Sequence, residues 1–198
     1  DDSAASRDKF FEIFDGAFDR GVSAITVHGR TVDQRYVGRS RWEFLAEVKR
    51  HAGPRTVLGS GDLFTSQDVV AMLRQTGVDG ATVARGAIGN PWVFREVRAL
   101  LAGELLPEPP TIFEQRAIIY EHYRVAMELY GAKQGARTMR KFGIKYSRLH
   151  PVPIAVRDAF VGVSSEQDWQ AVLAEWYATD GPGRHIQPAE MDETCEAA

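Results

Sequence analysis

Gly59-Ser60-Gly61-Asp62 and Ala84-Arg85-Gly86-Ala87 are the two stretches that decide the fold of this chain. Each follows a short run typical of a strand, residues 55–58 and 80–83, and each leads into a helical pattern. Two such junctions about 25 residues apart are typical of the end of a (β/α)8 barrel, where the loops after the last strands often hold a phosphate. Glycine lets the backbone approach the phosphate, and the first N–H groups of a helix donate to it. The pair predicts a phosphate site, with ordinary strand-to-helix turns as the alternative. Its candidate residues are Ser60, Gly61, Asp62, Ala84, Arg85 and Gly86.

A third junction precedes these two. Residues 24–27 form an apolar run that predicts a buried strand, and His28-Gly29-Arg30-Thr31 follows at its carboxyl end. Barrel enzymes place their ligand-binding groups at this edge, and the charged loop that follows is too long for a simple turn. His28 and Arg30 are therefore candidate ligands, while a purely structural histidine is the alternative.

Three runs carry a resemblance to a known family. Residues 26–31 (Thr-Val-His-Gly-Arg-Thr), residues 59–62 and residues 85–94 (Arg-Gly-Ala-Ile-Gly-Asn-Pro-Trp-Val-Phe) occur in the order found in tRNA-dihydrouridine synthases. The chain resembles this family over most of residues 1–150. The resemblance implies a TIM barrel followed by a small helical domain, FMN as cofactor, NADPH as reductant, and reduction of uridine to 5,6-dihydrouridine in tRNA.

The resemblance also assigns roles to individual positions. It places His28 against the flavin. For Arg30 two roles stay open, contact with the flavin phosphate and contact with the incoming RNA. Ser60 stands where the family usually has Asn, and Ala84 where it usually has Gly. A serine hydroxyl still donates to a phosphate or ribityl oxygen, and Ala84 still offers its N–H.

The length of the chain limits what it contains. A complete barrel takes about 250 residues and at least about 200, whereas this chain has 198 residues and only three strand signals before an all-helical stretch. We expect an α/β fold, namely the last three β/α units of a TIM barrel followed by a small all-α domain. By resemblance, the half that is missing carries a lysine near the flavin and the cysteine that donates a proton to uridine. The only cysteine here, Cys195, lies in an acidic tail, so no catalytic residue is assigned.

Two further expectations follow from an incomplete barrel. The chain alone should be inactive. It should also self-associate, because strand edges stay open and Ile25, Val27, Val57 and Val83 would face an unfilled interior.

A proline-rich stretch, residues 103–110, marks the clearest domain boundary. It predicts a barrel part at residues 1–104, a helical domain at residues 111–178 and a disordered tail at residues 179–198. The helices expected in the first part span residues 7–20, 42–51, 67–75 and 91–102. Those expected in the second part span residues 111–130, 133–149, 154–161 and 165–177.

The segment from Gly131 to His150 contains six basic residues and no acidic one. Helical spacing gathers most of these residues on one face, which can neutralise RNA phosphates. The alternative is a solvated helix face, but the family places a basic helix at this position against tRNA. The candidate RNA-binding residues are Arg137, Arg140, Lys141, Lys145 and Arg148.

Composition excludes several protein classes. The chain has 44% hydrophobic residues, a net charge of −3 and one cysteine, so we expect no disulfide framework, no membrane span and no metal, and a cytoplasmic location. Two alternative functions stay open, a non-catalytic RNA-binding fragment and another FMN- or phosphate-binding barrel oxidoreductase. The basic helical domain argues against the latter.

Overall fold

The computed structural model describes residues 3–35 and 37–187, except for the side chain of Lys133. Its contacts divide the chain into two compact units. The first unit runs up to Arg85 and includes Leu100–Gly103, and the second consists of Gly86–Ala99 and the chain from Glu104 onward. The predicted limits, 1–104 and 111–178, differ from this division mainly over residues 86–99.

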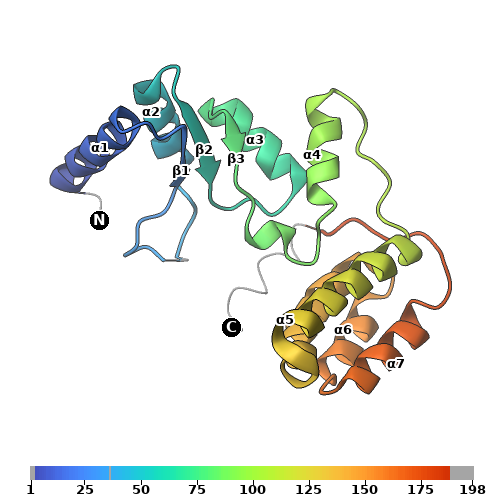
Figure 1. Cartoon of the computed structure of the whole chain (residues 1–198). Coiled ribbons are helices and arrows are strands. Elements are labelled where there is room, and N and C mark those ends of the chain that lie inside the picture. The colour runs from blue at the N-terminus through green and yellow to red at the C-terminus, as the bar shows by residue number, and fades with distance from the viewer. Residues whose placement is uncertain (1–2, 36, 188–198) are drawn as a thin grey trace. The chain divides into compact units, whose positions relative to one another are not determined.

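The first unit alternates helices and parallel strands (Figure 1). The chain passes through α1 (Ala4–Asp19), β1 (Ala24–His28), α2 (Trp42–Ala52), β2 (Thr56–Ser60), α3 (Ser66–Thr76) and β3 (Gly80–Ala81), and the short helix η1 (Arg85–Ala87) follows β3. The strands form one parallel sheet in the order β1-β2-β3. Strand β3 is shorter than predicted, although the Thr82 N–H still donates to the Gly59 carbonyl at 2.8 Å.

The described residues of the second unit form helices and no strand. They include the last two residues of η1, α4 (Val93–Leu101) except its last two residues, α5 (Ile112–Tyr146), η2 (Ser147–Leu149), α6 (Pro153–Val161) and α7 (Glu166–Trp176). Helix α5 is two helices joined at Gly131, whose φ of 74° and ψ of 163° are not helical. This break agrees with the predicted helices, of which one ends at residue 130 and the next begins at residue 133. The expected fold class, three β/α units followed by an all-α part, is confirmed. Helix α4 begins at Val93. The predicted start, Pro91, is two residues too early.

Local capping explains where several helices begin and end. Two helices begin with a capping box, formed by Thr65 with Asp68 and by Thr111 with Glu114. In each pair, the side chain of either residue accepts a hydrogen bond from the backbone N–H of the other. Gly77 ends α3 in the left-handed conformation, which costs a glycine little. All three signals act within a few residues of the helix end that they fix.

The valine side chains of the sheet face the helices, which is the opposite of our prediction. Val27 and Val57 are 4% and 0% exposed and do not face an unfilled interior. A Cβ on Gly59, which pairs with Val27, would meet Met72 of α3 and come within 3.4 Å of Leu45 of α2, so this face packs against the helices. Because side chains alternate along a strand, Thr26, His28 and Leu58 lie on the face without helices.

The start of the predicted tail is held by the second unit. The Arg184 N–H donates to the Leu149 carbonyl at 2.9 Å, and Gly183 lies so close to the Pro110 carbonyl that a Cβ would come within 2.1 Å of it. Ile186 packs against the hydrophobic core of this unit, which includes Trp92, Phe160 and Trp169. The tail from residue 188, including Cys195, lies outside the described residues.

Candidate functional site

The carboxyl ends of the parallel strands meet at one edge of the sheet and bring the predicted site residues together. His28 and Ser60 are partners in the register of β1 and β2, so their side chains share the face without helices. His28 is exposed and Ser60 is buried. On the same face, the hydroxyls of Thr26 and Thr82 lie 3.5 Å apart. This end of the sheet is therefore polar.

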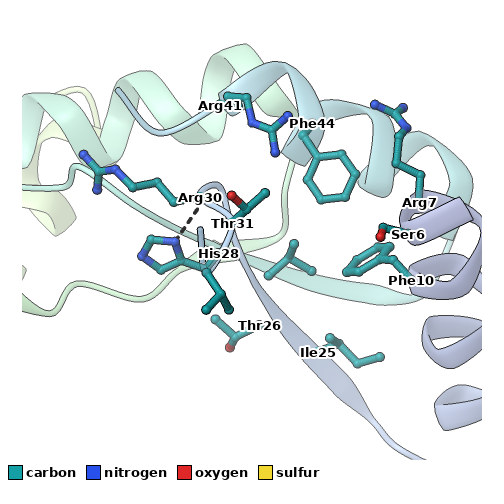
Figure 2. A pocket seen from close by; sticks show the side chains of 12 residues that line it. Ser6, Arg7, Phe10, Ile25, Thr26, His28, Arg30, Thr31, Arg41 and Phe44 are labelled. Carbon is teal, nitrogen blue, oxygen red and sulfur yellow. Dashed lines mark hydrogen bonds between the residues drawn. The ribbon is translucent and has the colours of Figure 1, made fainter. Parts of the chain in front are cut away.

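A backbone contact orients His28. Its Nδ1 accepts a hydrogen bond from the Arg30 N–H at 3.1 Å, drawn as a dashed line in Figure 2. With Nδ1 accepting, a neutral imidazole carries its proton on Nε2. His28 thus offers an N–H donor on its other nitrogen, a detail that the sequence does not reveal.

Asp62 joins the loops that follow all three strands. Its Oδ1 lies 2.6 Å from Nη2 of Arg30, in the loop after β1, and 3.6 Å from Nη2 of Arg85, which follows β3. Its Oδ2 accepts from the Ser40 N–H at 2.7 Å. The sequence predicts Asp62 as a cofactor ligand. In the structure its carboxylate links the loop after β1 to Arg85, which follows β3. The Arg30 side chain is only 7% exposed.

Ser40 fills the space between two glycines. A Cβ on Gly29 would lie 2.2 Å from the Ser40 Oγ, and a Cβ on Gly61 would lie 2.1 Å from it. Gly61 also has a φ of +129°, which side-chain-bearing residues rarely adopt. Gly61 is thus required by packing against Ser40 and by its backbone conformation. Sequence reasoning missed Ser40, because nothing in its local sequence marks it.

The last group of predicted ligands lies around Arg85. Its guanidinium lies over the Phe64 ring, 4.9 Å from the centroid, and its side chain is 33% exposed. Ala84 is exposed. Gly86 belongs to the second unit and lies in η1, whose first N–H groups have no partner inside the helix.

A cavity of about 350 Å³ opens beside β1 (Figure 2). Helices α1 and α2 line it with Phe10 and Phe44, and the strand end lines it with His28 and Arg30. The guanidinium groups of Arg7 and Arg41 lie 5.6 and 5.9 Å from the centre of the Phe44 ring. The walls are thus aromatic and cationic.

The five predicted RNA-binding residues fall into two groups. Arg137, Arg140 and Lys141 are exposed on the second half of α5, whereas Lys145 and Arg148 are half-buried. Arg148 donates from Nη2 to the Ile88 carbonyl at 2.9 Å. A Cβ on Gly89 would lie 2.5 Å from the Lys145 carbonyl carbon, so the backbone there packs against residues 88–89.

The described residues contain neither a metal-binding cluster nor a helix that could span a membrane. No group of three or more His, Cys, Asp or Glu side chains among them is placed to hold a metal ion. None of the helices in the described part of the chain has the length and apolar character needed to cross a membrane.

Comparison with known proteins identifies the family. The model of the dihydrouridine synthase family matches residues 2–179. A probable tRNA-dihydrouridine synthase of Mycobacterium tuberculosis (strain ATCC 25618 / H37Rv) is 36% identical over 179 residues, which cover 86% of this chain and 46% of the relative. tRNA-dihydrouridine synthase B of Xanthomonas campestris pv. campestris is 40% identical over 136 residues, which cover 68% of this chain and 40% of the relative. The chain spans about half the length of the curated relatives it matches. It belongs to the dihydrouridine synthase family.

Proposed function

We propose that this chain supplies the FMN- and tRNA-binding part of an oxidoreductase that reduces uridine to 5,6-dihydrouridine in tRNA, with NADPH as reductant. Membership of the family supports the reaction. The observation that carries the proposal is the gathering of His28, Ser60 and the Asp62-centred arginines at the ends of adjacent strands. No catalytic proton donor is assigned to this chain.

The residues at the strand ends fit the phosphate end of FMN. Arg30, Arg85 and Asp62 together carry a formal charge of +1, which favours an anion. Two buried polar atoms nearby, Nε of Arg30 and Oγ of Ser40, have no hydrogen-bond partner among the described residues, and buried polar atoms normally have one. We assign the phosphate to Arg85, Ser60 and the backbone N–H groups of Gly61 and Ala84, with Asp62 holding the two arginines in place.

The ring end of FMN is assigned to His28. The chemistry that FMN would supply when bound is transfer of a hydride from NADPH to the uracil ring. A reduced flavin ring carries negative charge that a nearby donor stabilises, and the Nε2–H of His28 is such a donor on the exposed face of the sheet. The bond from the Arg30 N–H to Nδ1 holds the imidazole in that orientation.

The RNA is assigned to the basic face of α5. Arg137, Arg140 and Lys141 are exposed there, and such side chains can neutralise phosphates of a folded RNA. Lys145 and Arg148 would contribute charge from half-buried positions. A non-catalytic RNA-binding role is the second candidate, favoured by these exposed charges. Flavin binding separates the two, because an RNA-binding module needs no flavin.

The phosphate assignment is tested in the complete protein, this chain joined to the half that it does not span, by replacing Arg85 with Gln. Flavin absorbance per protein should fall by about tenfold or more, because one charge-assisted bond to phosphate contributes about 1.5–3 kcal/mol. Arg74→Gln, on an exposed position of α3, is the matched control. Full flavin content in Arg85→Gln would exclude the phosphate assignment.

The RNA assignment is tested with the charge reversals Arg140→Glu and Lys141→Glu. They place negative charge against phosphate and should abolish tRNA binding near physiological salt, while the flavin content of the complete protein stays unchanged. Unchanged tRNA affinity and salt dependence would mean that this face is merely solvated.

A further inference from the structure

The loop between β1 and α2, residues 29–41, is long, and many hydrogen bonds hold its described residues. The Arg41 N–H donates to the Gly29 carbonyl at 2.8 Å, which closes the base of the loop. The Ser40 N–H donates to Asp62, and Nη2 of Arg30 donates to the Gly38 carbonyl at 2.8 Å. Both ends of the loop are thus fixed to the strand-end edge of the first unit.

The tip of the loop, residues 31–35 and 37–39, has its own internal bonds. The Gln34 side-chain amide donates to the carbonyls of Val37 and Arg39, at 3.0 and 2.9 Å, and the Gln34 N–H donates to the Thr31 hydroxyl at 3.1 Å. The tip therefore has a defined shape without being packed into the core.

The tip exposes side chains that suit RNA. Arg35 and Arg39 are exposed, and neither guanidinium has a hydrogen bond or ion pair to another described residue. Val32 and Val37 are 90% and 78% exposed. Arginines that are not neutralised by the fold bind phosphates, and apolar side chains beside them can contact a ribose or an unstacked base.

We propose that the tip of the β1–α2 loop, through Arg35 and Arg39, binds the ribose-phosphate backbone of the substrate RNA. The inference rests on the proposed function. A target base that approaches the flavin ring beside His28 brings its flanking phosphates toward the loop that begins at the next residue. The contact is distinct from the basic face of α5, which belongs to the other unit.

The test uses this chain and an unmodified tRNA transcript, with affinity measured by fluorescence anisotropy at several salt concentrations. Arg35→Gln with Arg39→Gln removes both charges and keeps most of each side chain. Arg50→Gln with Arg74→Gln is the matched control. Both control residues are exposed and lie in the last turns of α2 and α3, which lead to the opposite edge of the sheet.

The loop variant should bind tRNA roughly tenfold more weakly at about 0.1 M salt, with the slope of log affinity against log salt reduced by about two, because each phosphate contact contributes about 0.9. The control should match the parent chain. tRNA should also protect Arg35 and Arg39 from modification by phenylglyoxal and leave Arg50 and Arg74 reactive.

Each result has one meaning. If the loop variant binds like the control and tRNA protects neither arginine, the loop is not an RNA contact and the inference is overturned. If Arg140→Glu with Lys141→Glu loses binding in that same experiment, RNA binding by α5 still stands. If the parent chain shows no tRNA binding at all, the inference and the RNA part of the proposed function are both overturned.

Discussion

Replacing Gly61 with alanine should destabilise the first unit because two independent costs add at this position. An alanine Cβ would lie 2.1 Å from the Ser40 Oγ and 2.8 Å from its Cβ, and overpacking of this kind costs about 1–3 kcal/mol. A φ of +129° adds about 1–3 kcal/mol for a residue with a side chain. The free energy of unfolding should thus fall by about 2–6 kcal/mol.

A second substitution separates the two costs. Ser40→Gly removes the atoms that the new Cβ meets but leaves the backbone strain. In the double variant, Gly61→Ala with Ser40→Gly, about 1–3 kcal/mol of the loss should return as a favourable coupling energy. Urea denaturation followed by circular dichroism, at one fixed protein concentration, measures all four corners of the cycle.

The cycle can refute the reasoning. If Gly61 is a glycine only so that the backbone can approach a phosphate, Ser40→Gly restores nothing and the coupling energy stays below about 0.5 kcal/mol. A stable Gly61→Ala chain would be a stronger contradiction, since it would mean that the Gly29–Ser40–Gly61 contact does not constrain the loops.

Three other outcomes are expected. Incubated with FMN, NADPH and unmodified tRNA, the chain alone should form no dihydrouridine detectable by mass spectrometry of nucleosides; turnover above a no-protein blank would contradict this. Because β1 and β3 are the outer strands of the described sheet, the chain should self-associate in analytical ultracentrifugation, and a purely monomeric species that unfolds cooperatively would count against it. Burial lowers the pKa of His150, so the unfolded chain takes up its proton first, and stability should fall as the pH drops through about 6.5 toward the folded pKa. His150 is 5% exposed, donates from Nε2 to the Trp176 carbonyl and accepts from the Val152 N–H on Nδ1. A His150→Gln chain should therefore lose part of the pH dependence seen by urea denaturation between about pH 7.5 and 5.5, and an unchanged dependence would exclude His150 as its source.

Local signals explain which parts of the fold were predictable. Thr65, Gly77 and Thr111 act within a few residues of their own position, so their effect on helix ends can be read directly. The error in predicting which face of the sheet meets the helices also has a physical cause. In a parallel sheet both faces are buried in the complete protein, so apolar character does not say which face meets the helices. Here the valine face does.

The candidate site depended on contacts that no local pattern carries. The sequence pointed to His28, Ser60 and Arg85 because each follows a strand, and the carboxyl ends of parallel strands meet at one edge. Ser40 and Asp62 are 22 residues apart, and only the folded loops bring the serine N–H to the carboxylate. The sequence therefore predicts Asp62 as a cofactor ligand but does not reveal its contacts with Ser40, Arg30 and Arg85.

Residues 85–94, the run that resembles the family most specifically, are constrained by two kinds of contact. Arg85 contacts Asp62 and Phe64 in the first unit. From Gly86 onward the run belongs to the second unit, where Trp92 joins the helical core and Gly89, with a φ of +75°, lies against the Lys145 backbone. A run interpreted only as a phosphate loop would leave this glycine and this tryptophan unexplained. Their packing shows that this part of the run is constrained by the helices of the second unit.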